Sequence, residues 1–190
     1  EGGVQVNVKG RRFSDESLGY SEQAAVVLAQ PDRCAFTVFD ERIASIARQF
    51  EDFRRAEQVG AVLTADTPAE LAARARLPAA ALADTLLEVA VLKQTGGIDV
   101  FGRSFAGVAQ LNPPYRAVRV TGALFHTQGG LVIDEQARVL RQNGTVIPNL
   151  YAAGGAACGV SGASAAGYLS GNGLLAAIAL GRVAGRAAAS

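Results

Sequence analysis

A glycine-rich stretch near the carboxyl end constrains the fold of this chain more than any other feature. Residues 150–175 read LYAAGGAACGVSGASAAGYLSGNGLL, with an apolar run at 150–153, a loop of small residues, and apolar residues at helical spacing after Gly173. Glycines let the backbone approach a flat or anionic group closely, and the start of a helix offers unpaired N–H groups. The stretch predicts a buried strand, a glycine loop and a helix, built either as a packed turn or as a ligand site.

Composition excludes several classes of protein. With 49% hydrophobic and 18% charged residues, the 190 residues predict a globular chain with one good core or two small ones. The net charge of +1 gives no reason to expect nucleic acid as a partner. Cys34 and Cys158 favour free thiols over a lone disulfide. No apolar run approaches ~18 residues. We therefore expect a cytoplasmic protein without a membrane span.

Hydrophobic periodicity predicts helices and strands along the whole chain. Helical patterns occur at 21–30, 40–53, 67–76, 78–96 and 176–190. Strand patterns occur at 2–8, 34–39, 62–63, 116–121, 122–125, 130–133 and 138–140. The pattern at 40–53 predicts one shared helix face, formed by Ile43, Ile46, Ala47 and Phe50. Gly181 and Gly185, four residues apart, suit close packing of the last helix on a sheet.

Two chemical constellations are considered from the residues alone. GVSGA is similar to the G-x-S-x-G elbow of serine hydrolases, but Ala163 replaces the second glycine and His126 is the sole candidate base, so we do not favour a hydrolase. One histidine and two distant cysteines give no ligand spacing, so we expect no metal site. The charged segment GRRFSDES predicts a hairpin with its charges in water, because exposure is the default for charge.

The order of residues resembles flavoproteins of the fumarate reductase/succinate dehydrogenase type. LYAAGG, a glycine loop, GYLSGNGLL and a helix ending GRVAGRAAA resemble the C-terminal end of these proteins. Four earlier segments resemble theirs in the same order: GGVQVNVKGRRFSDES, ADTPAELAARARLPAAALADTLLEV, DVFGR and HTQGGLVIDEQARVL. The resemblance implies an α+β fold, in which a mixed α/β capping domain is combined with the C-terminal β-strands and final helix of an FAD-binding domain.

The resemblance also implies a domain division and a cofactor. Residues 1–16 would enter from the FAD-binding domain, 17–112 would form the capping domain, and 113–190 would return to the FAD-binding domain. FAD would be the cofactor, and its expected contacts are His126, Thr127, Gly154, Gly155, Gly171, Asn172, Gly173 and Leu174. Gly155 stands where the family usually carries an acidic residue.

The beginning of the chain predicts a fragment. The sequence has no methionine and opens on EGGVQVNV, already inside a strand pattern. Within the resemblance, the G-x-G-x-x-G dinucleotide fingerprint would belong to a missing N-terminal part, which we expect as the partner of this piece. The fragment alone is expected to be inactive and free of FAD.

Two tyrosines are the candidate catalytic residues. Tyr20 in DESLGY and Tyr168 in GYLSGNG match positions where flavin-dependent 3-ketosteroid dehydrogenases of the same superfamily carry active-site tyrosines. A phenol can accept a proton beside a carbonyl or polarise that carbonyl. From the residues alone, the pair could equally be interface packing. Dicarboxylate enzymes of the family instead place arginines and a histidine at positions occupied here by Ala44, Tyr168 and Phe125.

The resemblance implies an FAD-dependent oxidoreductase that acts on CH–CH bonds. It would transfer a hydride between flavin N5 and a carbon next to an activating carbonyl of a small-molecule substrate. One alternative is an enzyme of the fumarate reductase or succinate dehydrogenase type, which acts on a dicarboxylate. An alternative of another class is a non-catalytic binding or structural module that keeps the fold.

Overall fold

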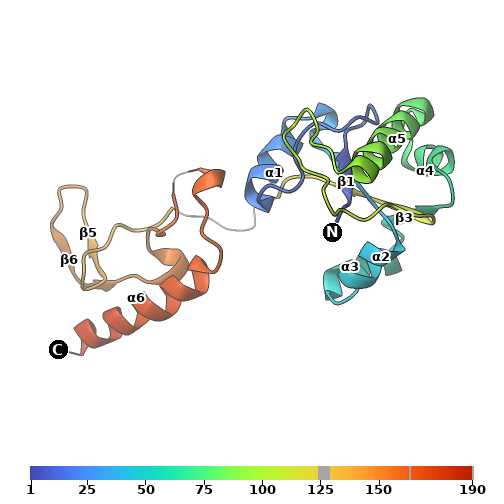
Figure 1. Ribbon diagram of the computed structural model, residues 1–190. Helices are drawn as coiled ribbons and strands as arrows, with labels where there is room; N and C mark the ends of the chain where they lie inside the picture. Colours follow the sequence, from blue (N-terminus) through green and yellow to red (C-terminus); the bar gives the residue numbers. More distant parts are fainter. Residues whose placement is uncertain (124–128, 163, 190) are drawn as a thin grey trace. The chain divides into compact units, whose positions relative to one another are not determined.

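The chain forms two compact units, Glu1–Gly122 and Ala123–Ser190. The computed structural model describes residues 1–123, 129–162 and 164–189, and Figure 1 shows the elements of each unit. Among these residues no helix combines the length and the apolar character that crossing a membrane requires. The first unit includes residues 113–122, which the sequence analysis assigns to the FAD-binding domain. The predicted division into 1–16, 17–112 and 113–190 describes the domains of a whole flavoprotein, and it stays a prediction.

A four-stranded antiparallel sheet forms the centre of the first unit. Its strands are β1 (Val4–Val6), β2 (Ala35–Phe39), β3 (Val62–Ala65) and β4 (Tyr115–Val120), in the order β1-β2-β4-β3. The cross-strand partners Val6↔Phe36 and Phe36↔Arg119 share one face, and Gln5↔Thr37 share the other. We call these the Phe36 face and the Gln5 face.

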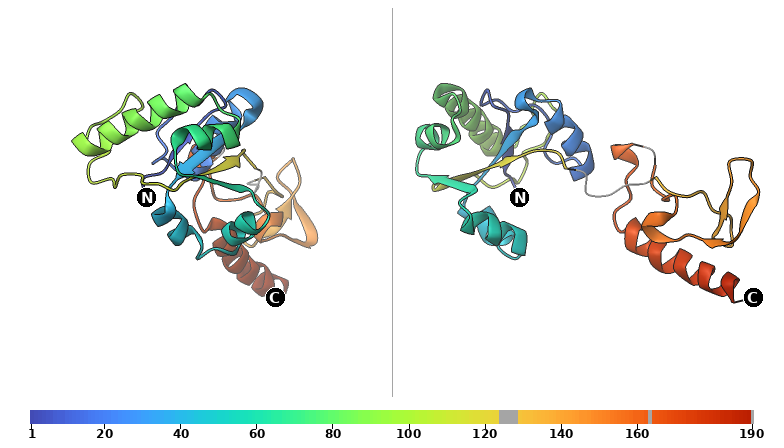
Figure 2. Two further views of the ribbon diagram at one scale, coloured as in Figure 1. Left: turned by 90° about the vertical axis from the view of Figure 1, so that its right-hand side faces the viewer. Right: turned by 180° about the vertical axis from the view of Figure 1, so that it is seen from behind.

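Two helices cover the Phe36 face. They are α4 (Pro68–Ala75) and α5 (Ala79–Thr95), which Figures 1 and 2 show on one side of the sheet. Thr67 caps α4 by accepting a hydrogen bond from the Glu70 amide at 3.2 Å, and Gly96 ends α5 in the left-handed conformation. Between sheet and helices lies the main core, which includes Val4, Val38, Leu71, Leu82, Val89 and Phe105.

Shorter helices lie on the opposite side of the sheet from α4 and α5. They are α1 (Tyr20–Leu28), α2 (Glu41–Ala47) and α3 (Glu51–Gln58), and the 3₁₀ turn η1 (Pro31–Arg33) follows α1 in the chain. The rings of Phe39 and Phe53 meet edge to face, 5.9 Å apart. Arg116 of β4 pairs with both Glu41 and Glu57, which fastens α2 and α3 to the sheet.

The prediction of one helix over 40–53 is wrong. The helix ends at Ala47, and Phe50 is extended and 66% exposed before α3 begins. Ala44, rather than the predicted stripe, is the fully buried residue of α2. Arg48 bridges the interruption, since it pairs with Glu41 and with Glu57. These pairs stabilise a broken helix where the apolar pattern alone favours a continuous one.

The second unit has a smaller core. A hairpin of β5 (Arg138–Leu140) and β6 (Val146–Tyr151) is followed by the 3₁₀ turns η2 (Gly154–Ala156) and η3 (Ala165–Gly167) and by α6 (Asn172–Ala188). The fully buried residues of its core are Val139, Ala152 and Ala157. The expected close packing at Gly181 and Gly185 is wrong within the described residues, because a Cβ at either position meets nothing within 4 Å.

Three strand predictions need correction, although the α+β class is confirmed. The run at 150–153 is not a buried strand, because β6 ends at Tyr151 and Leu150 is 41% exposed. Residues 122 and 123 are outside any strand, and residues 124 and 125 lie outside the described residues. In 130–133, Leu131 and Ile133 form isolated bridges rather than a strand. Short apolar runs do not carry enough periodicity to fix such bounds.

Candidate functional site

A hollow on the Gln5 face contains one of the two candidate tyrosines. It has a volume of about 510 Å³, and we call it the Tyr20 hollow. Its walls combine polar and apolar side chains, including Gln5, Glu16, Leu18, Tyr20, Gln23 and Val120. Tyr20 is the first residue of α1 and is 69% exposed, so its ring is accessible to a molecule in the hollow.

Hydrogen bonds fix the polar wall of the Tyr20 hollow. Gln23 is buried on the inner side of α1, where its Nε2 donates to Gln5 Oε1 at 2.6 Å and to Ser14 Oγ at 2.9 Å. Gln5 Nε2 in turn donates to Thr37 Oγ1 at 3.1 Å. Because each amide is held by two partners, this wall presents a fixed set of polar atoms.

A largely buried carboxylate forms part of that wall. Glu16 Oε2 accepts from Arg12 Nη2 at 2.7 Å and from Arg103 Nη1 at 2.6 Å, while Glu16 Oε1 accepts from the Gln5 amide at 2.9 Å. The side chains of Arg12, Glu16 and Arg103 are 6–8% exposed. The prediction that GRRFSDES places its charges in water is therefore wrong for Arg12 and Glu16, because partners distant in sequence neutralise them.

A second carboxylate completes this network. Arg12 Nη1 lies 2.6 Å from Asp99 Oδ2, an ion pair without hydrogen-bond alignment. Burial is the largest influence on Asp99 and raises its pKa, but Arg12 and the amides of Arg103 and Phe101 outweigh it and lower the pKa below its usual value. Asp99 thus stays ionised, and it ties the 99–105 loop to the segment that leads into α1.

The second unit brings the predicted glycines to one end of α6. Gly154 has a φ of +57°, and a Cβ there would lie 3.1 Å from the Cβ of Ala177 in α6. The glycine lets η2 pack against the early turns of α6 without a side chain between them. Gly155 is exposed, and a Cβ at this position would meet nothing within 4 Å.

The loop that leads into α6 is closed on itself. Ser161 Oγ accepts from the Leu169 amide at 3.0 Å and from Asn172 Nδ2 at 2.5 Å. The Gly162 amide donates to the Gly167 carbonyl at 2.8 Å, and a Cβ at Gly162 would lie 2.9 Å from Gly167 Cα. Asn172 is 4% exposed, so its side chain holds the loop while its backbone begins the helix.

The start of α6 fits a flat group with an electron-rich edge. Gly171 precedes the helix with a φ of +80° and open space around it, and α6 has neither a side-chain cap nor an acidic residue in its first turn. The first-turn amides, including those of Gly173 and Leu174, lack partners within the helix and carry the positive end of its dipole. Leu174 is 77% exposed and offers an apolar contact. The carbonyl edge and flat body of a flavin match these features.

The structure gives the positions of eight of the ten predicted site residues, and their roles stay predictions. It places Gly171, Asn172, Gly173 and Leu174 at the start of α6, with Gly154 packed on its early turns. Tyr168 directly follows η3 and is half-buried. Tyr20 and Tyr168 belong to different compact units. His126 and Thr127 lie outside the described residues.

Sequence reasoning missed the supporting residues of the Tyr20 hollow. Gln23 gave no signal, because a glutamine within a short helix normally faces water. Glu16 belonged to the charged box that we noted, but its partner Arg103 lies 87 residues away in the sequence. Only the folded chain shows that pairing.

Comparison with known proteins identifies the family. The model of the family described as "FAD binding domain" matches residues 1–174. The chain therefore belongs to this FAD-binding family, and FAD is the cofactor that this membership assigns. The resemblance to fumarate reductase-type flavoproteins is confirmed.

Several known flavoproteins match nearly the whole chain. A cytochrome-type fumarate reductase of Shewanella frigidimarina is 32% identical over 188 residues, which cover 99% of this chain and 32% of the relative. The open conformation of a flavocytochrome c3 fumarate reductase gives a TM-score of 0.76 at 29% identity, covering 99% of this chain and 32% of that one. A 3-ketosteroid Δ1-dehydrogenase from Sterolibacterium denitrificans gives 0.71 at 27% identity, covering 99% and 39%. The chain spans about a third of the length of these proteins.

Proposed function

We propose that this chain contributes the substrate-covering and flavin-facing parts of an FAD-dependent oxidoreductase acting on CH–CH bonds. The observation that carries the proposal is the uncapped start of α6, with a left-handed glycine before it and no acidic residue in its first turn. When bound, FAD supplies a hydride acceptor or donor at flavin N5. We place the protein in the cytoplasm, since Cys34 is in no disulfide.

The chain's own backbone would hold the ring. Amides of Gly173 and Leu174 would donate to the electron-rich edge of the flavin and stabilise negative charge on it. Gly154 and Gly155 would allow close approach beside η2, and His126 and Thr127 would supply further contacts. These roles are proposals that follow from the family and from the geometry at α6.

The two tyrosines would act on the substrate. Tyr20 lines a hollow of about 510 Å³, within the range of small-molecule sites. A phenol hydroxyl that donates to a substrate carbonyl lowers the barrier to loss of the neighbouring proton. We assign this polarising or proton-accepting role to Tyr20 and Tyr168, acting from the capping part and from the last loop.

A dicarboxylate substrate is the second candidate, favoured by the 32% identity to a fumarate reductase. Against it, the charged side chain that lines the Tyr20 hollow is a carboxylate, Glu16, and no arginine is among the described lining residues. Ala44 is fully buried and apolar, so it cannot supply the guanidinium that a carboxylate ligand needs.

Assays with the full-length, flavin-loaded protein separate these proposals. We expect oxidation of 4-androstene-3,17-dione or a simpler cyclic ketone with an artificial electron acceptor, and no reduction of fumarate by reduced methyl viologen. Reduction of fumarate would instead show that the protein acts on a dicarboxylate. A purified full-length protein that shows no flavin absorbance and takes up no FAD would support the non-catalytic module instead.

A further inference from the structure

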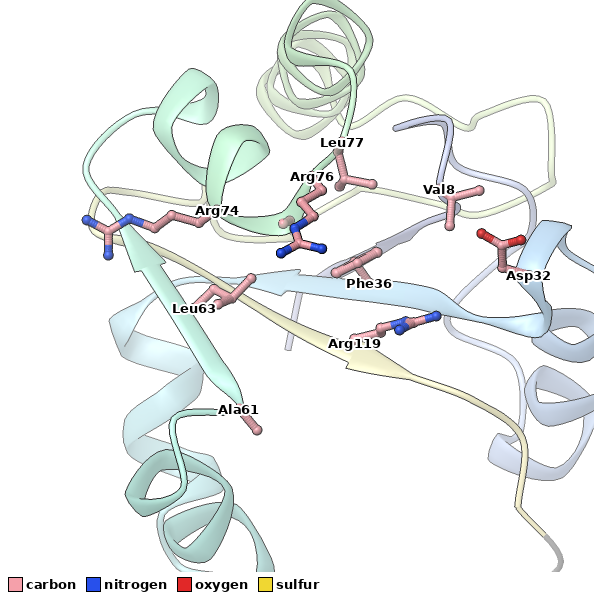
Figure 3. A pocket seen from close by; sticks show the side chains of 10 residues that line it. Val8, Asp32, Phe36, Ala61, Leu63, Arg74, Arg76, Leu77 and Arg119 are labelled. Atoms are coloured by element: carbon pink, nitrogen blue, oxygen red, sulfur yellow. The ribbon is translucent and has the colours of Figure 1, made fainter.

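A second hollow lies at the end of the Phe36 face, on the opposite side of the sheet from the Tyr20 hollow. It has a volume of about 410 Å³, and Figure 3 shows the side chains that line it. We call it the arginine hollow, because Arg74, Arg76 and Arg119 surround it. The hollow lies where α4 ends at Ala75 and the chain turns into α5.

Arg119 occupies a register position that faces the core. It pairs with Phe36 across β2 and β4, and Phe36 pairs with Val6 on β1, so the three side chains share one face. Across the strands β1, β2 and β4, this row of side chains consists of the apolar Val6 and Phe36 and then the charged Arg119. Arg119 Nε donates to Cys34 Sγ at 3.4 Å, which leaves the terminal N–H groups for another partner.

Two further residues of the hollow have an unusual backbone. Arg76 follows α4 with a φ of +56°, and Asp32 in η1 has a φ of +57°. Glycine or asparagine is usual where a helix ends in this conformation. The left-handed backbone fixes where Arg76 leaves the chain, and Figure 3 shows its guanidinium directed into the hollow, whereas that of Arg74 is directed away.

Among the described lining residues, Asp32 carries the opposite charge and attracts Arg119 electrostatically. Considering residues 1–123, 129–162 and 164–189, no carboxylate lies within ion-pair distance of Arg74, Arg76 or Arg119. The floor beneath them is apolar, with buried Phe36 and Leu77 and half-buried Leu63. An apolar floor beside the guanidinium groups of Arg76 and Arg119 is suited to an anion that carries an apolar body.

We propose that the arginine hollow binds a monoanionic organic carboxylate with an aliphatic or aromatic body. Arg76 and Arg119 hold the carboxylate, and the body lies over Phe36, Leu63 and Leu77. Asp32 lies beside Arg119 (Figure 3) and disfavours dianions, because a second negative charge would meet its carboxylate. The hollow shares no lining residue with the Tyr20 hollow and includes none of the proposed flavin contacts.

The proposal is tested by NMR titration of the ¹⁵N-labelled 190-residue chain with octanoate. We expect saturable shifts at the amides of Leu63, Arg76, Leu77 and Arg119, with an affinity on the order of millimolar for a ligand of this size. Residue resolution separates this site from the exposed apolar face of α6. Octan-1-ol has the same alkyl chain and no charge, so it should bind at least about tenfold more weakly than octanoate. The octyl phosphate dianion should also bind more weakly than octanoate, because its second negative charge would meet Asp32.

Three variants locate the charge that matters. Arg76→Asn keeps a residue that tolerates the left-handed backbone, and Arg119→Gln keeps the polar stem; each should weaken octanoate binding about tenfold. Arg74→Gln is the matched control and should change the affinity less than about twofold. Equal binding of octanol, unchanged affinity in both Arg76→Asn and Arg119→Gln, or no saturable shift in the hollow would overturn the proposal.

Discussion

Buried charge distinguishes several individual residues of the first unit. Lys93, near the end of α5, is 7% exposed, and its Nζ donates to the Gly2 carbonyl at 2.7 Å. Burial is the main influence and lowers the pKa of Lys93 to about 8, with a further lowering from Arg103. A buried ammonium with one neutral acceptor is costly, and that cost depends on pH.

We predict that Lys93→Met changes the pH dependence of stability. Below pH 8 the lysine is charged in both folded and unfolded states, so its burial cost is fully present. Between pH 8 and 10.5 the folded state releases the proton first, so wild-type stability rises relative to the variant, by at most about 3 kcal/mol. Urea unfolding of both proteins at several pH values measures this difference. A constant difference from pH 7 to 11 would contradict the buried charge.

We predict that each tyrosine hydroxyl contributes to turnover. Tyr168→Phe and Tyr20→Phe in the flavin-loaded protein should lower turnover ~10²–10³-fold, because a donor to the substrate carbonyl is lost. Flavin content should remain unchanged, since the proposed flavin contacts near Tyr168 come from the backbone. Tyr151→Phe, which removes a hydroxyl bonded to the Ala187 carbonyl, is the control. If both Tyr20→Phe and Tyr168→Phe keep wild-type turnover, the two tyrosines have no catalytic role and only pack at an interface.

At the scale of elements, local signals allowed prediction and distant contacts did not. The helices at 68–75 and 79–95 were predictable because Thr67, Pro68 and Gly96 mark their ends in the sequence itself. The break between α2 and α3 was not, because it depends on Arg48 meeting Glu41 and Glu57. Helical periodicity contains no information about such pairs.

Within the candidate site, too, the residues marked by local sequence patterns were predicted, and those that depend on distant partners were not. The glycines at the start of α6 were found because the strand, loop and helix pattern is contiguous in sequence. The buried Glu16 and Gln23 were missed because their partners come from other segments. Residue types that normally face water acquire an interior role only when the fold supplies those partners.

We predict a measurable effect of the Thr67 cap on α4. Thr67→Ala should destabilise the chain by about 1 kcal/mol, because the Glu70 amide loses its acceptor. Thr67→Ser keeps the hydroxyl and should retain most of the stability. Chemical denaturation monitored by circular dichroism measures both. Equal losses in the two variants would show that the methyl group, rather than the cap, matters.

We predict a larger effect from the carboxylate that joins two segments. Glu16→Gln leaves Arg12 and Arg103 buried beside a neutral group, so the free energy of unfolding should fall by about 3 kcal/mol. Arg11→Gln is the control, because its pair with Asp84 is exposed and should contribute less than about 1 kcal/mol. Similar small losses in both variants would argue against the buried network.

At the scale of the whole molecule, the two units differ in how much apolar surface they bury. The first has one extensive core between the sheet and helices α4 and α5. The second buries few residues and leaves Leu174, Leu175 and Ile178 of α6 66–77% exposed. Stability should therefore be uneven, with the slowest hydrogen exchange in β2 and β4. Equal protection of β5 and β6 would contradict this expectation.

The central claim is that the start of α6 faces the flavin, and the reduction potential of the bound flavin tests it most directly. Gly173 is the second residue of α6, so Gly173→Pro removes one amide from the first turn, where helices tolerate proline best, and Gly173→Ala keeps that amide. Loss of a donor to the reduced ring should lower the midpoint potential by about 30–60 mV in the proline variant, with little change in the alanine variant. Identical potentials in the two flavin-loaded variants would contradict the claim.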